Sequence, residues 1–141
     1  MNLLRGYFDM PVSYRFDSGI LVYELTGAYS PDDVQGVFSE AFRDPACPLK
    51  PRILIDLSNS QSIATRSSST VNDMAAYMKL FRSKFGNRIA FVVSDNLVYG
   101  LVRMGAASAG ITDFEVEIFR SQTEGIRWLL ESAHPSGAPD D

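Results

Sequence analysis

Five consecutive residues, Ile53-Leu54-Ile55-Asp56-Leu57, constrain the fold of this chain more than any other stretch. Side chains on a β-strand alternate between two faces, and here both faces are apolar except for one carboxylate. A strand of this kind lies inside a sheet and is covered above and below. The run from Ser58 to Thr70 is too rich in Ser, Asn and Thr to continue the strand, and it leads into a helical pattern. The sequence therefore predicts a central strand, then a loop, then a helix amino terminus, which is where open α/β sheets bind ligands and partners.

The rest of the chain alternates strand and helix patterns around this stretch. Residues 88–93 form a second strand that is apolar on both faces, whereas residues 12–17, 20–25 and 114–119 alternate apolar and polar residues. The two-residue connection Ser18-Gly19 predicts an antiparallel hairpin between the first two strands. Apolar stripes at helical spacing predict helices near residues 31–43, 71–85, 97–110 and 122–133. Gly86 is expected to end the second helix in the left-handed conformation.

This order predicts an α/β fold with a mostly parallel five-stranded sheet, one antiparallel edge strand at Val12–Asp17, and four helices. The third and fourth strands should lie in the middle of the sheet, because their faces are both apolar. We expect an N-terminal arm at residues 1–11, one domain at 12–133 and a disordered, Pro/Gly/acid-rich tail at 134–141.

Composition excludes several classes of function. The chain has 141 residues and a net charge of −4, without a cluster of Lys and Arg, so nucleic acid is not an expected partner. It has no apolar run long enough to span a membrane and no secretory signal, and its single cysteine fits a reducing compartment. These features predict a cytoplasmic protein.

The sequence also lacks the residue sets of common enzymes. The single histidine, His134, lies in the tail, so it cannot be expected to pair with a nucleophile, and Cys47 lies in a Pro-rich connector without a base nearby. Metal-ligand spacings and phosphate-binding glycine motifs are absent. We therefore expect a protein that binds and does not catalyse, with no metal and no cofactor.

Asp56 is the most informative single residue, because a buried carboxylate is costly unless its oxygens are paired. One interpretation is an acid that faces a partner or ligand. The other is an acid at a strand end that accepts backbone N–H bonds from the following loop. The sequence alone leaves both open.

The hydroxyl-rich loop after Asp56 is the main candidate surface. Its candidate binding residues are Ser58, Thr65, Arg66, Ser67 and Ser68. A loop that runs into a helix amino terminus favours anions, although the same residues also suit a solvated, capped loop.

Asp95, Tyr99 and Arg103 form a second candidate group, after the fourth strand. Tyr99 and Arg103 are four residues apart and should share a helix face. They could line the carboxyl edge of the sheet together with Asp56, or they could be a helix cap and a solvated helix face.

A resemblance to a known family rests on the hairpin, the strand Ile53–Leu57, the Ser/Thr loop, the strand Arg88–Val93 and the ending Phe119-Arg120 with Gly125–Leu129. Together these segments resemble the STAS domains of bacterial anti-sigma factor antagonists, and more closely the STAS-like family named after SpoIIAA. The resemblance covers most of residues 12–132 and implies a β-α superhelix with strands adjacent in chain order. It implies a bacterial regulatory module that binds a protein partner.

The resemblance also suggests a modification site and an alternative. Regulatory STAS domains carry a phosphorylatable Ser, preceded by Asp, in this loop, and counting from Asp56 places Thr65 at that Ser and Ala64 at that Asp. The fold is shared with CRAL-TRIO lipid-binding domains, so the alternative is a carrier of a small apolar ligand, with Met74, Met78, Phe81 and Met104 as candidate lining. We also expect a homodimer, on the premise that the helices of this fold lie largely on one face of the sheet and leave the other to a partner subunit.

Overall fold

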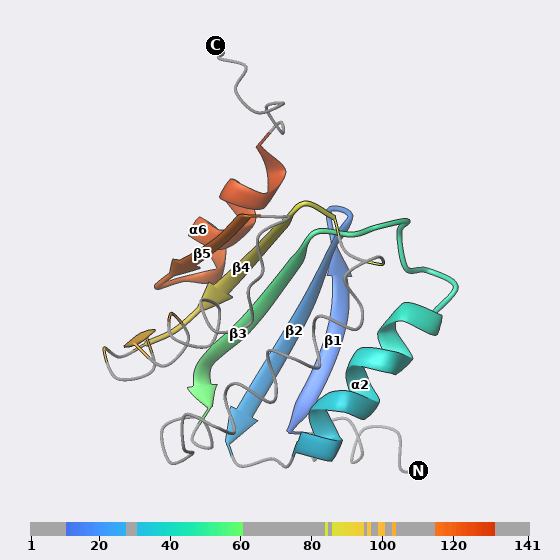
Figure 1. Ribbon diagram of the computed structural model, residues 1–141, viewed down its shortest axis with the longest axis horizontal. Coiled ribbons are helices and arrows are strands. Elements are labelled where there is room, and N and C mark those ends of the chain that lie inside the picture. The colour runs from blue at the N-terminus through green and yellow to red at the C-terminus, as the bar shows by residue number, and fades with distance from the viewer. Residues whose placement is uncertain are drawn as a thin grey trace.

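A computed structural model describes residues 11–27, 31–60, 86–94 and 115–131, together with single residues at 84, 96, 99, 100 and 103. Within these ranges the chain forms one sheet with helices against it (Figure 1). The elements are β1 (Val12–Asp17), β2 (Ile20–Gly27), α2 (Pro31–Arg43), β3 (Ile53–Ser60), β4 (Arg88–Val92), β5 (Glu115–Phe119) and α6 (Gln122–Leu130).

The sheet has the predicted topology. Its strands lie in the order β1-β2-β3-β4-β5, with β1 antiparallel to β2 and every later pair parallel. The hairpin turn at Ser18 and Gly19 has φ values of 56° and 81°, the left-handed conformation that two-residue hairpin loops require. The antiparallel edge strand and the central positions of β3 and β4 are therefore confirmed.

Two local predictions need correction. β3 does not end at Leu57 but continues to Ser60, because β2 also continues and offers partners, with Asn59 opposite Thr26 and Ser60 opposite Gly27. Gly86 does not have a positive φ. It is needed for space, since a Cβ there would lie 2.8 Å from the Lys50 carbonyl oxygen.

Two of the four predicted helices are seen in the described residues. α2 ends at Arg43, just before Asp44-Pro45, because the residue before a proline is disfavoured in a helix. α6 begins after the N-cap residue Ser121, whose hydroxyl accepts a 3.2 Å hydrogen bond from the Glu124 N–H. The helix predicted near 71–85 and most of the one near 97–110 lie outside the described residues, as do the arm and the tail. No helix in the described part of the chain is long and apolar enough to cross a membrane.

The two described helices cover opposite faces of the sheet. Phe38 and its neighbours on α2 pack with Tyr23 and Ile55, whereas Leu129 on α6 packs with Val22 and Leu54. Figure 1 shows α2 beside β1 and β2, and α6 beside β4 and β5. Since successive strand residues point to opposite faces, these are the two faces of one sheet. The premise on which the homodimer was expected therefore does not hold for the described helices.

Candidate functional site

The ends of the parallel strands meet at one edge of the sheet, which we call the carboxyl edge. The arrowheads of β2 to β5 all point toward it in Figure 1. β4 and β5 stay joined past their ends, because the Val93 N–H donates to the Phe119 carbonyl at 2.9 Å. The Ser94 hydroxyl donates to the Ser58 carbonyl at 2.9 Å, which joins the ends of β4 and β3. The carboxyl ends of β3, β4 and β5 are thus held together.

Asp56 is 9% exposed, and both of its carboxylate oxygens accept hydrogen bonds. Oδ1 accepts from the Ser58 N–H at 2.8 Å and from the Ser58 hydroxyl at 2.6 Å. Oδ2 accepts from Nε2 of Gln122 at 2.6 Å. A backbone N–H bond to Asp56, as in one of the two interpretations, is present, but its donor Ser58 lies inside β3 and not in the following loop. These bonds offset the cost of burying the carboxylate and fix the end of β3, from which the Ser/Thr loop continues.

A second carboxylate lies beside Asp56 on the same face. Glu24 is opposite Asp56 in the parallel register of β2 and β3, and like charges so placed repel each other. Nε2 of Gln122 also donates to Glu24 at 2.8 Å, so one side-chain amide bridges the two acids. Arg15 completes the arrangement with a 2.8 Å ion pair to Glu24 and a 2.9 Å hydrogen bond from its Nη2 to the side-chain oxygen Oε1 of Gln122. We call Arg15, Glu24, Asp56 and Gln122 the bridged acid network.

Three members of this network were not predicted from the sequence. Arg15 and Glu24 were assigned to the polar side of strands and given no role, although strand alternation could have placed Glu24 on the face of Asp56. Gln122 follows the capping residue Ser121, and a helix that starts there brings its first turn to the carboxyl edge. The sequence contained the pattern for each of these residues, but the order of the strands was needed to place their side chains together.

A tyrosine with two arginines lies at the same edge. The guanidinium carbon of Arg103 is 5.9 Å from the centre of the Tyr99 ring, and that of Arg120 is 5.5 Å from it. Tyr99 and Arg103 therefore share a helix face, as predicted. Nη2 of Arg120 also donates to the side-chain oxygen Oδ1 of Asn96 at 2.7 Å. Arg120 was not predicted as a site residue. We call Tyr99, Arg103 and Arg120 the arginine–tyrosine cluster.

The remaining candidates lie outside the described residues. They are Thr65, Arg66, Ser67, Ser68 and Asp95. Their binding roles, and the phosphorylation of Thr65, remain predictions.

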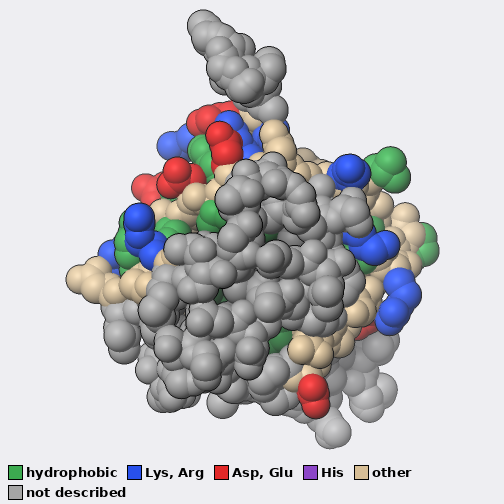
Figure 2. Space-filling model, in the orientation of Figure 1, with side chains coloured by type: hydrophobic (Ala, Val, Ile, Leu, Met, Phe, Trp, Pro, Cys, Tyr) green, Lys and Arg blue, Asp and Glu red, His purple; other side chains and the backbone are tan. Residues whose placement is uncertain are grey.

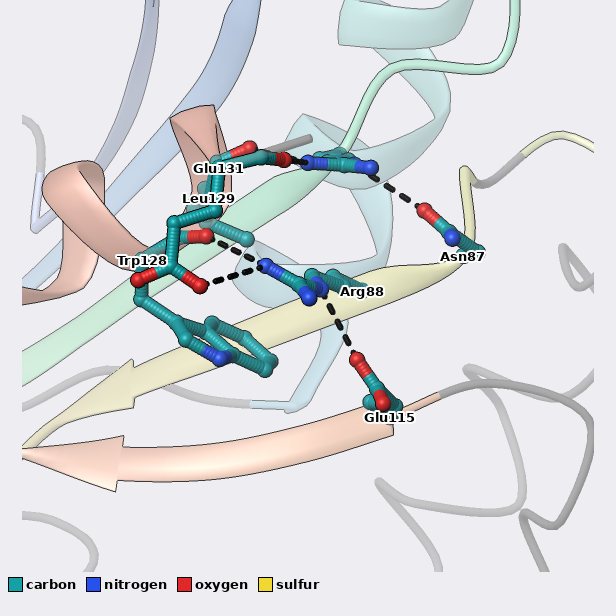
Figure 3. Close-up of polar contacts among 7 residues, drawn as sticks. Asn87, Arg88, Glu115, Trp128, Leu129 and Glu131 are labelled. Atoms are coloured by element: carbon teal, nitrogen blue, oxygen red, sulfur yellow. Dashed lines mark hydrogen bonds and ion pairs between the residues drawn. The ribbon is translucent and has the colours of Figure 1, made fainter. Parts of the chain in front are cut away.

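The opposite, amino edge of the sheet carries a different polar group of residues, shown in Figure 3. Arg88 forms a 2.8 Å ion pair with Glu115 and donates to the Trp128 carbonyl at 2.6 Å, and its guanidinium lies 4.7 Å from the Trp128 ring centre. Arg52 donates to the carbonyls of Leu129 and Glu131 at the end of α6. Figure 2 shows acidic and basic side chains side by side over this part of the molecule. Arginines so placed stabilise a helix carboxyl terminus.

A third polar contact joins β1 to the end of α2. The Tyr14 hydroxyl donates to Oδ2 of Asp44 at 2.6 Å. This bond is the main reason that the pKa of Tyr14 is raised to about 12 and that the pKa of Asp44 is lowered. Burial, with a smaller contribution from Asp44, raises the pKa of the Cys47 thiol, which disfavours the reactive thiolate. Among the described residues, no three His, Cys, Asp or Glu side chains are close enough together to hold a metal ion.

Comparison with known proteins supports the fold. No protein-family model matches the chain, and neither does any curated protein sequence. Among solved structures, the chain is similar to an uncharacterised protein of the DUF3478 family from Shewanella loihica PV-4, which is described as having a SpoIIAA-like fold. The match has a TM-score of 0.56 and 16% sequence identity, and it covers 84% of this chain and 91% of the other. The resemblance inferred from the sequence is therefore confirmed at the level of the fold, which is SpoIIAA-like.

Proposed function

We propose that this chain is a non-catalytic, STAS-like regulatory module that binds a protein partner at the carboxyl edge of its sheet. The observation that carries the proposal is the bonding of Asp56. Its oxygens accept bonds from Ser58 and Gln122, so the buried acid positions the last residues of β3, from which the Ser/Thr loop continues, and the start of α6. A carboxylate occupied in this way suits a scaffold for a binding surface better than a general base.

The exposure of the surrounding groups agrees with this role. Asn59, Ser94 and Asn96 are exposed at this edge, and the ion pair of Arg15 and Glu24 has side chains 43% and 40% exposed. Exposed polar groups on a fixed backbone form the rim of many protein interfaces. The partner would therefore meet a preorganised surface, which lowers the entropy cost of binding.

Thr65 is the proposed regulatory position in the loop. A phosphate there would add about −1.5 to −2 charges beside Arg66. That charge favours an ordered loop, and it would repel an acidic partner that docks on it. Glutamate at position 65 supplies part of this charge and allows a direct test.

The experiment measures partner affinity for matched variants. The partner is first isolated by affinity purification from the native host, and its Kd is then measured for wild type, Thr65→Glu and Leu49→Glu. Leu49→Glu adds the same charge to a side chain that is 93% exposed, in the connector before β3 at the amino edge. We expect Thr65→Glu to change Kd by about tenfold or more, while Leu49→Glu leaves it within about twofold. Equal affinity of all three proteins would contradict the proposal.

The alternative, a carrier of a small apolar ligand, makes a different prediction. Its candidate lining residues, Met74, Met78, Phe81 and Met104, lie outside the described residues. Native mass spectrometry of the protein purified from its own host distinguishes the two functions. A retained lipid-sized mass favours the carrier, whereas a co-purified protein in fixed stoichiometry favours the module. The same spectrum reports whether the chain is a homodimer.

A further inference from the structure

We infer that the arginine–tyrosine cluster is a binding site for a phosphate group, in which Arg103 and Arg120 supply the charge and Tyr99 holds both guanidinium groups near one point. This inference deepens the proposed function, because it assigns a ligand chemistry to the same edge of the sheet. It is tested below without the partner.

Two guanidinium groups, from different elements, lie near the same aromatic ring. Both guanidinium carbons lie within 6 Å of the Tyr99 ring centre, although Arg103 is in a helical segment and Arg120 follows β5. Both arginines are exposed, while Tyr99 is half-buried and packs against the core cluster on the α2 face of the sheet. The anchored Tyr99 ring is thus a shared neighbour of two like charges that belong to different elements of the fold.

The second argument is the contrast with the other arginines. Arg15 has the carboxylate of Glu24, and Arg88 has those of Glu115 and Glu131. In the part of the chain that the structure describes, neither Arg103 nor Arg120 forms an ion pair with a carboxylate. Within the same residues, Arg120 donates to an uncharged group, the side-chain carbonyl oxygen of Asn96. Two guanidiniums near one ring, without a carboxylate partner among the described residues, form a local positive site.

The third argument is the match to phosphate. A phosphate monoester carries about −1.5 to −2 charges and three acceptor oxygens, so it can satisfy two guanidiniums at once. Planar guanidinium groups bind such oxygens in a bidentate manner. A single carboxylate carries one negative charge, so it would leave one arginine uncompensated.

The test is a titration of the ¹⁵N-labelled full chain with inorganic phosphate, followed by NMR at constant ionic strength. The site variant is Arg103→Gln/Arg120→Gln. The control is Arg43→Gln/Arg127→Gln, which removes the same charge from two exposed arginines on α2 and α6. We expect the site variant to bind phosphate at least about tenfold more weakly and the control to stay within about twofold of wild type. Unchanged binding in the site variant, or an equal loss in the control, overturns the inference.

Tyr99 has its own pair of variants. Tyr99→Phe keeps the ring, so phosphate affinity should stay within about twofold, whereas Tyr99→Leu releases the guanidiniums and should weaken it by about fivefold or more. Circular dichroism of each variant confirms that it is folded. Equal affinity of Tyr99→Phe and Tyr99→Leu would show that the ring does not organise the site.

Two further ligands identify the source of the phosphate. N-acetyl phosphoserine amide represents a phosphorylated side chain of a protein, and ribose 5-phosphate represents a free metabolite. Tighter binding of the first than of inorganic phosphate indicates a protein source, and tighter binding of the second a metabolite. If phosphate does not bind but Thr65→Glu still weakens the partner, the phosphate site is wrong and the proposed docking role stands. The reverse result keeps the site and removes the docking role.

Discussion

The two ends of α6 are attached to the sheet by different chemistry. At the carboxyl edge, the Gln122 amide at the start of the helix bridges the carboxylates of Glu24 and Asp56. At the amino edge, Arg88 and Arg52 donate to the last carbonyls of the helix. The Arg88 side chain is only 8% exposed, whereas Arg15 in the bridged acid network is 43% exposed. The comparison indicates that the amino edge holds the fold and that the carboxyl edge also faces outward.

The largest effect should follow from Arg88→Ala at the amino edge. It breaks the ion pair to Glu115 and leaves the Trp128 carbonyl without its 2.6 Å donor. We expect a loss of roughly 3 kcal/mol in the free energy of unfolding, because both effects are costly where the arginine is buried. Urea unfolding measures it. The control Arg127→Ala removes an exposed arginine from α6 and should change stability by about 0.5 kcal/mol or less. Similar losses in both variants would show that the contacts of Arg88 at the amino edge do not stabilise the fold.

Gly86→Ala should give the second largest effect. The new Cβ would lie 2.8 Å from the backbone carbonyl oxygen of Lys50. The two backbone segments are tied to each other by the 2.7 Å hydrogen bond from the Gly86 N–H to the Pro51 carbonyl. We expect about 2 kcal/mol of destabilisation from this overlap. Gly36→Ala on the exposed side of α2 meets no atom within 4 Å and should be neutral or stabilising. Thermal unfolding of both variants checks the prediction, and a neutral Gly86→Ala would refute the close approach.

At the carboxyl edge, Gln122→Ala should have a smaller effect on stability. It removes the shared donor between Glu24 and Asp56, but the Ser58 bonds to Asp56 and the Arg15 ion pair to Glu24 remain. We expect a loss of about 1 kcal/mol. Thr123→Ala, at the next and exposed position of α6, is the matched control. A loss for Gln122→Ala as large as that for Arg88→Ala would remove the distinction between the two edges.

The smallest effect concerns the contact of Tyr14 with Asp44, which belongs to neither edge network. The pKa of Tyr14 is about 12 in the folded chain, mainly because of its bond to Asp44, against an ordinary value of 10.0. The raised pKa means that the contribution of Tyr14 is complete below pH 10 and is lost as the pH rises toward 12. Wild type should therefore lose stability faster than Tyr14→Phe above pH 10. Parallel curves for the two proteins in chemical denaturation would contradict this.

The sequence was sufficient for the sheet but not for the polar networks. Strand order and the antiparallel edge followed from Ile53–Leu57, Arg88–Val93 and the Ser18-Gly19 turn, because burial on two faces and turn length are local signals. The bridged acid network joins residues up to 107 positions apart, and such pairs depend on register. Arg120 was overlooked for the same reason, since its ring partner lies on another element.

The contacts of Arg88 with the end of α6 at the amino edge also could not be predicted from the sequence. Arg88 opens a strand with two apolar faces, and its role depends on the end of α6, which packs over that strand. The end of β3 was set too early because the Ser-rich composition was given more weight than the pairing available from β2.

Hydrogen–deuterium exchange of the chain, alone and with its purified partner, tests the central claim most directly. If the carboxyl edge is the docking surface, binding should slow exchange at residues 57–60, 94–96 and 120–122 and leave residues 86–88 and 129–131 unchanged. Slower exchange confined to residues 86–88 and 129–131 would contradict the account, because the partner would then bind the edge that we assign to holding the fold.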